Sequence, residues 1–155
     1  MGLRHKSREI ALTALYQAEM SGNPVLEGFP LLCDTFEVNQ KAVPYARELV
    51  EGIAGRWEEL NGRIGERAQN WRLSRMSVLD RNIIRIAAYE MLFRDDVPPR
   101  VAIDEAIELA KRFCTDDSPS FINGILDAIL KSLPAGGQAD AGGTTTTGSG
   151  IGGRE

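Results

Sequence analysis

The chain has 155 residues, 43% of them apolar and 26% charged, and a formal net charge of −4. This composition is typical of a globular protein with one domain or two compact subdomains, and no apolar run approaches the ~20 residues that a membrane helix requires. The basic start lacks the continuous apolar run of a secretion signal, and the two cysteines lie far apart, so we expect reduced thiols and a cytoplasmic location.

The first predicted helix runs from about Ser7, a candidate N-cap, to Ser21, and Gly22-Asn23-Pro24 ends it. Cations are unfavourable near the positive end of a helix dipole, yet four basic residues lie there: Arg4, His5, Lys6 and Arg8. We interpret them as a short flexible arm that binds phosphates, because the arm and the helix end would then favour the same anion. The alternative is a solvated basic start without a ligand.

Helical spacing of apolar residues continues through the middle of the chain, without the sustained alternation that indicates strands. A weaker helix is predicted at about 26–38, where Pro30 makes its start uncertain. A third helix begins near Lys41. Several glycines weaken this helix, so we expect a break or bend near 55–57 or 69–73.

The last part of the folded chain predicts three further helices. Two of them cover about 77–94 and 101–113, and Ser118 opens the third as its N-cap. Residues 1–133 are therefore expected to form an all-α domain of six or seven amphipathic helices. Residues 134–155 are rich in glycine and poor in apolar side chains, so we expect a disordered tail.

Residues suited to catalysis are scarce in this sequence. His5 is the one histidine, and there is neither a phosphate-binding glycine loop nor a set of metal ligands at a recognisable spacing. The acid pairs Asp95-Asp96 and Asp116-Asp117 adjoin helix boundaries, where acids commonly cap backbone N–H groups. We therefore expect no catalytic residue, no metal and no cofactor.

Two groups of residues are candidates for binding. Tyr16, Phe113 and Phe121 could stack on unpaired bases, although for each residue alone packing in the core is the more common role. Arg81 and Arg85 lie four residues apart on one helix face, beside Asp80. That face is either solvated surface or a docking surface for another protein, in which arginine is often enriched.

Three stretches resemble one known family, the bacterial transcription antitermination factor NusB. They are RHKSREIALTALYQAEM, LDRNIIRIAAYEMLFRDDVPPRVAIDEAIELAKRF and SPSFINGILDAIL. Their order and spacing cover nearly all of residues 3–133. The resemblance implies an all-helical fold of two packed helical halves, with neither catalysis nor a cofactor.

The resemblance also implies a role in transcription. Proteins of this family bind the single-stranded boxA element of nascent ribosomal RNA together with NusE, a small ribosomal subunit protein, and help RNA polymerase in its antitermination complex to resist termination. The RNA surface would include the basic residues named above and the positions Phe113, Asp117, Phe121 and Asn123. The NusE surface would lie around Asp80, Arg81 and Arg85.

Two alternatives remain open at this point. NusB-like helical domains also occur fused to ribosomal RNA methyltransferases, so the chain could resemble an RNA-binding accessory domain of such an enzyme. It could also be a non-catalytic protein–protein scaffold with a solubilising basic start. The sequence leaves open which bases are read, and whether the free protein forms a homodimer in the absence of RNA.

Overall fold

The computed structural model describes residues 2–35, 37–68 and 73–134, and within these it contains α-helices and short 3₁₀ helices but no strand. The all-α prediction is confirmed. None of the described helices is long and apolar enough to cross a membrane. The α-helices are α1 (Leu3–Ser21), α2 (Val25–Thr35), α3 (Val43–Gly55), α4 (Trp57–Ala68), α5 (Val78–Phe93), α6 (Pro99–Phe113) and α7 (Ser118–Ser132). Apart from Pro134, the predicted tail lies outside the described residues.

Helix α1 begins four residues earlier than predicted. Its first helical residue is Leu3, and its N-cap position is Gly2. Ser7 is not an N-cap, because it is buried and its hydroxyl donates to the backbone carbonyl oxygen of Ala42 at 2.7 Å. The basic residues therefore lie in the first two turns of a helix, and the predicted flexible arm is wrong.

Helix α1 ends at Ser21, before the Gly22-Asn23-Pro24 stop, as predicted. Gly22 adopts a φ of +81°, the left-handed region that glycine enters without strain, and its N–H donates to the carbonyl oxygen of Ala18 at 2.9 Å. This cap turns the chain sharply into α2, which begins at Val25 and continues through Pro30 to Thr35.

Two other predicted boundaries are resolved by the structure. Of the two expected breaks, the one near 55–57 is present, because α3 ends at Gly55 and α4 begins at Trp57. The other, near 69–73, falls largely on residues 69–72, outside the described part of the chain. Helix α7 begins at Ser118 itself, so the N-cap position belongs to Asp117, whose side chain makes no capping hydrogen bond.

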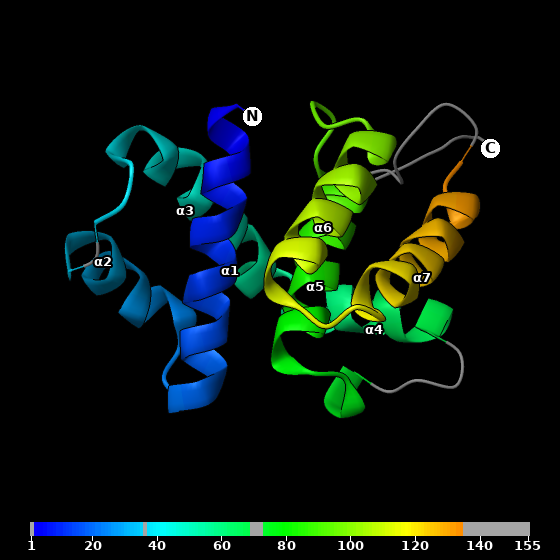
Figure 1. Ribbon diagram of the computed structural model, residues 1–155, viewed down its shortest axis with the longest axis horizontal. Helices are drawn as coiled ribbons and strands as arrows, with labels where there is room; N and C mark the ends of the chain where they lie inside the picture. Colours follow the sequence, from blue (N-terminus) through cyan, green and yellow to red (C-terminus); the bar gives the residue numbers. More distant parts are fainter. Residues whose placement is uncertain (1, 36, 69–72, 135–155) are drawn as a thin grey trace.

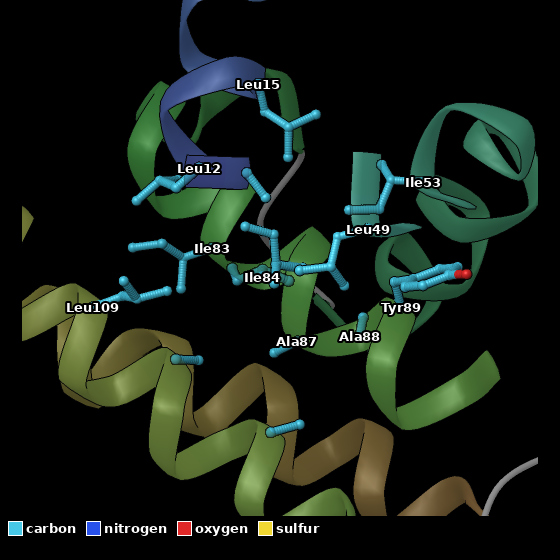
Figure 2. Packing of buried hydrophobic residues seen from close by; sticks show 14 of the residues in the cluster. Leu12, Leu15, Leu49, Ile53, Ile83, Ile84, Ala87, Ala88, Tyr89 and Leu109 are labelled. Atoms are coloured by element: carbon cyan, nitrogen blue, oxygen red, sulfur yellow. The ribbon is translucent and has the colours of Figure 1, made fainter. Parts of the chain in front are cut away.

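Helix α5 forms the centre of the molecule. Every residue from Asn82 to Leu92 is buried, which is expected only for a helix that has neighbours on all sides. Helices α1 to α3 lie on one side of it and α4, α6 and α7 on the other, and one hydrophobic cluster joins both halves (Figure 1). Figure 2 shows α1, α3 and α6 meeting α5 through these side chains: Leu12, Leu15, Leu49, Ile53, Ile83, Ile84 and Leu109.

One glycine allows α3 to approach α5 closely. A Cβ added to Gly52 would lie only 2.0 Å from the hydroxyl oxygen of Tyr89. The glycine that weakens α3 in isolation is therefore required by the packing. This contact helps to fix α3 beside the end of α5 that carries Glu90.

Candidate nucleic-acid interface

Arg8 points into the molecule and pairs with a buried carboxylate of α5. Its Nε donates to both carboxylate oxygens of Glu90, at 3.0 and 2.9 Å, and the hydroxyl of Tyr45 donates to the same group. Arg8 is 5% exposed and Glu90 is fully buried. Burial opposes the charged guanidinium, but Glu90 outweighs it and raises the pKa of Arg8. Arg8 therefore holds α1 to α5 and offers no surface to a ligand.

His5 lies in the same ionic cluster. Its Nδ1 is 2.8 Å from a carboxylate oxygen of Glu105 on α6, and its Nε2 is 3.1 Å from Glu9 on α1. Its side chain is mostly buried, with 14% exposed. Acids from two helices thus compensate the cations at the start of α1, which removes the conflict with the helix dipole.

Arg4 and Lys6 are the basic side chains at the start of α1 that reach solvent. Arg4 pairs with Asp96 at 2.7 Å, but both side chains are nearly half exposed. Because an exposed ion pair contributes at most about 1 kcal/mol, an anion could compete for Arg4. Lys6 is exposed and forms no ion pair with any described residue. The predicted cationic surface is therefore reduced to these two residues.

Lys6 and Phe113 line one hollow between the start of α1, the end of α2 and the end of α6. The hollow has a volume of about 380 Å³, and Ile10, Leu32 and Val38 supply its apolar surface. Phe113 is 42% exposed, so its ring is available for stacking. The structure thus brings together a cation and an aromatic ring from opposite ends of the sequence.

Arg112 is a residue of this surface that the sequence analysis did not select. Its side chain is 61% exposed, donates to Glu9 at 2.6 Å, and lies 5.3 Å from the centre of the Phe113 ring. An exposed guanidinium beside an exposed ring is a common arrangement for holding bases and phosphates. Its position next to Phe113 in the sequence was a usable signal, because both lie in the last turn of α6.

The remaining predicted RNA residues are not all in the same place. Asp117 is exposed at the start of α7, Asn123 is exposed further along it, and Phe121 packs partly against the core. They follow the loop that begins after Phe113. Tyr16, by contrast, lines a second hollow between α1 and α2; it is ten residues from Lys6, a rise of about 15 Å along a helix.

The predicted partner surface on α5 faces the interior. Arg81 and Arg85 do share a helix face, as expected, but both donate to Glu19 of α1. Arg85 is only 5% exposed and stacks 4.2 Å from the centre of the Trp57 ring. Burial opposes ionisation, but hydrogen bonds from the two arginines and Asn82 lower the pKa of Glu19 to about 2. These arginines join α1 to α5 and leave little surface for another protein.

Asp80 also makes internal contacts. Its backbone N–H donates to the hydroxyl of Ser77 at 3.0 Å, so Ser77 is the N-cap of α5. Burial and a hydrogen bond to Asp80 raise the pKa of the Cys114 thiol to about 12. Asp80 therefore connects the start of α5 to the loop that carries Asp117.

The acid pairs near helix ends do not act as predicted caps. Asp96 accepts hydrogen bonds from Arg94 and Arg4, which together lower its pKa to about 2, while the side chain of Asp117 makes no capping hydrogen bond. Among the described residues, no group of three or more His, Cys, Asp or Glu side chains could hold a metal ion.

Comparisons with known proteins agree with this geometry. The NusB family model matches residues 5–131. The transcription antitermination protein NusB of Desulfosudis oleivorans is 45% identical over 146 residues, covering 90% of this chain and 92% of its own. The protein of the same name from Desulfotalea psychrophila is 46% identical over 135 residues, covering 83% of this chain and 96% of its own.

Solved structures are similar over the same length. T. maritima NusB superimposes with a TM-score of 0.75 at 37% identity, covering 83% of this chain and 91% of that one. A structure of the antitermination factors NusB and NusE in complex with double-stranded RNA gives a TM-score of 0.76 at 25% identity, covering 86% of this chain and 99% of that one. The helical fold, the family match and the extent of identity together show that this chain belongs to the NusB family.

Proposed function

We propose that this chain is a non-catalytic transcription antitermination factor that binds boxA-type single-stranded RNA of nascent ribosomal transcripts together with NusE. The observation that carries the proposal is the hollow in which Lys6 and Phe113 lie together, at the surface of a chain whose relatives are named antitermination proteins. The antitermination complex of the transcribing RNA polymerase is the larger assembly, and a cytoplasmic location is part of this proposal.

The chemistry of the hollow suits a single strand better than a duplex. Lys6 supplies a phosphate contact, and the exposed face of Phe113 supplies a stacking surface for an unpaired base. Arg4 and Arg112 are two further exposed cations at the start of α1 and the end of α6, and each pairs with a carboxylate at the surface. Asp117, Phe121 and Asn123 continue the proposed surface onto α7.

We propose that this chain and NusE bind the same RNA cooperatively. A solved relative contains NusB and NusE together with RNA. If both proteins touch one strand, RNA tightens the association with NusE by the same factor as NusE tightens the association with RNA. The side chains of Arg81 and Arg85 are turned toward α1. We therefore propose that NusE contacts the exposed surface in the middle of the chain, near the start of α5, rather than these two side chains.

The test is a fluorescence titration of a boxA-type RNA, with and without NusE, at two salt concentrations. Lys6→Ala should lower the affinity and reduce the slope of log K against log salt by about 0.7, the value for one lost contact with a single strand. Phe113→Ala should weaken binding by about 1–3 kcal/mol with an unchanged slope, because stacking is not ionic.

The matched control is Lys131→Ala, which removes the same charge from an exposed lysine on α7. It should leave both affinity and slope unchanged. If Lys6→Ala and Lys131→Ala behave alike, the hollow is not the RNA site. Methyl-donor binding measured by calorimetry would instead favour the methyltransferase accessory alternative.

A further inference from the structure

Glu9 places a negative charge in the hollow that Lys6 and Phe113 line. Glu37 lines the same hollow, is exposed, and forms no ion pair with any described residue. Lys6 is the one cation among the described residues that line it. Two carboxylates there repel a phosphate and one lysine attracts it, so a nucleic acid binds well only if the charge of Glu9 is compensated.

Two cations compensate Glu9, and they differ in exposure. Both contact its Oε2, with Nη1 of Arg112 at 2.6 Å and Nε2 of His5 at 3.1 Å. The side chain of Arg112 is 61% exposed, whereas that of His5 is 14% exposed. A phosphate can draw the exposed Arg112 away from Glu9. His5 is then the cation that remains beside Glu9.

The contacts of His5 require a proton on each ring nitrogen. Its Nδ1 lies 2.8 Å from Oε1 of Glu105, while Nε2 faces Glu9. A carboxylate only accepts hydrogen bonds, and a neutral imidazole has one N–H and one nitrogen lone pair. A neutral ring would therefore direct its lone pair at one of the two carboxylates. The imidazolium, with an N–H on each side and a positive charge, fits both.

The two carboxylates beside the ring depend on it to different extents. Oε1 of Glu105 also lies 3.4 Å from Nη1 of Arg8, so a second, buried cation remains beside Glu105 whatever the charge of His5. Glu9 has no such second cation once Arg112 turns to a phosphate. The other charged groups around the start of α1 form no ion pair with His5, and they are Arg4, Lys6, Lys41, Glu90 and Asp96.

We propose that His5 is a positioning residue for RNA binding, which as an imidazolium holds and neutralises Glu9 while Arg112 and Lys6 contact phosphates. This inference rests on the proposed function and adds a dependence on protons to it. When the pH rises and the ring loses one proton to the solvent, Glu9 regains its full negative charge or keeps Arg112 for itself. In either case the affinity for RNA falls.

The test repeats the titration of a boxA-type RNA at about pH 6 and about pH 8.5, on either side of the range in which histidine changes its charge. At the lower pH, His5→Gln should bind about fivefold more weakly than wild type, the size expected for one surface ion pair. Wild type should lose about the same factor at the higher pH, where the ring becomes neutral, while His5→Gln should bind equally at both.

Nuclear magnetic resonance gives an independent reading of the ring. Because His5 is the one histidine of the chain, its ring nitrogen signals are assigned without ambiguity and report its protonation at each pH. The loss of RNA affinity in wild type should follow the loss of the proton seen in these signals. Calorimetry in two buffers of different ionisation enthalpy should show that RNA binding takes up protons from the solvent, and that His5→Gln abolishes this uptake.

Glu9→Gln separates a positioning role from direct contact with RNA. It removes the charge that His5 compensates, so its RNA affinity should not depend on pH, and adding His5→Gln to it should cost no further affinity. If His5 itself contacted the RNA, the pH dependence would remain in Glu9→Gln. Glu105→Gln is the matched control, because Glu105 also contacts the ring but lines a separate depression of α6. This variant should keep the pH dependence.

Three results would overturn the inference. The first is equal RNA affinity of wild type and His5→Gln at the lower pH. The second is a pH dependence that persists in His5→Gln, which would assign it to another group. The third is an equal loss of affinity in Glu105→Gln and His5→Gln with lowered melting temperatures, which would reduce His5 to joining α1 and α6. Absence of RNA binding at both pH values would instead overturn the proposed function itself.

Discussion

The charged residues of helix α1 have different ionic partners on its inward and outward faces. On the inward face, Arg8 and Glu19 are paired with charges of α5, and their partners are buried or nearly so. On the outward face, Lys6 is exposed and has no ionic partner among the described residues. Residues two positions apart in one basic run therefore have different roles: Arg8 stabilises the fold, and Lys6 remains available to a ligand.

The comparison shows that a basic run cannot be interpreted from its composition alone. The partners that decide the role of each cation are Glu90, Asp96 and Glu105, which lie far along the chain. A cation whose partner is buried is committed to the structure, while one whose partner is exposed can exchange it for a phosphate. Substitutions on the two faces should therefore separate into effects on stability and effects on binding.

The largest effect is expected for Glu90→Gln on the inward face. The substitution removes the buried counter-charge of the Arg8 guanidinium, which then keeps only the longer contact with Glu105 at 3.4 Å, so the free energy of unfolding should fall by about 3–5 kcal/mol. Urea denaturation followed by circular dichroism would measure it. Combining Arg8→Met with Glu90→Leu should cost less than Glu90→Gln alone, and a loss below about 1 kcal/mol for the single variant would contradict the buried pairing.

A smaller loss is expected for Glu19→Gln, because Glu19 is partly exposed. It accepts hydrogen bonds from Arg81, Asn82 and Arg85, and hydrogen bonds to a charged group contribute about 1.5–3 kcal/mol. The free energy of unfolding at neutral pH should fall by about 2 kcal/mol. A variant as stable as the wild type would show that the cluster does not join α1 to α5.

The pH dependence of that loss has a defined sign. The arginines lower the pKa of Glu19 from about 4.5 to about 2, so its contribution is fully present above pH 4.5 and is lost as the pH falls toward 2. The difference in unfolding free energy between wild type and Glu19→Gln should therefore shrink across this range. Urea titrations at several acidic pH values would measure it, and a difference independent of pH would contradict the assignment.

The smallest effect on stability is expected on the outward face. Arg4→Gln breaks a pair between two nearly half-exposed side chains, so it should change the free energy of unfolding by no more than about 1 kcal/mol. Lys6→Ala should leave the melting temperature unchanged while it weakens RNA binding. A clear drop in melting temperature for Lys6→Ala would place Lys6 with Arg8 in the ionic cluster that supports the fold.

The helices themselves were predictable because their signals are local. Apolar spacing and the Gly22 stop depend on neighbours within a few residues, and the structure has them where expected. The start of α1 was not predictable in this way. Ser7 has the chemistry of an N-cap, but its hydroxyl instead bonds the carbonyl oxygen of Ala42, a contact that exists only after α1 and α3 pack together.

The candidate site was predicted in part, for the same reason. Lys6 and Phe113 were selected separately, and the fold brings them together. The spacing of Arg81 and Arg85 correctly placed them on one face, but nothing local indicates that this face meets Glu19 rather than solvent.

The buried polar residues of α5 have a consequence for the order in which the protein matures. Helix α1 leaves the ribosome first, but the charges that neutralise its inward residues, Arg85 and Glu90, are synthesised more than sixty residues later. Until they emerge, the nascent N-terminal half cannot reach its native arrangement, and a fragment ending before α5 should not fold. Completion of the N-terminal half is thereby tied to synthesis of the chain at least as far as α5, which ends at Phe93.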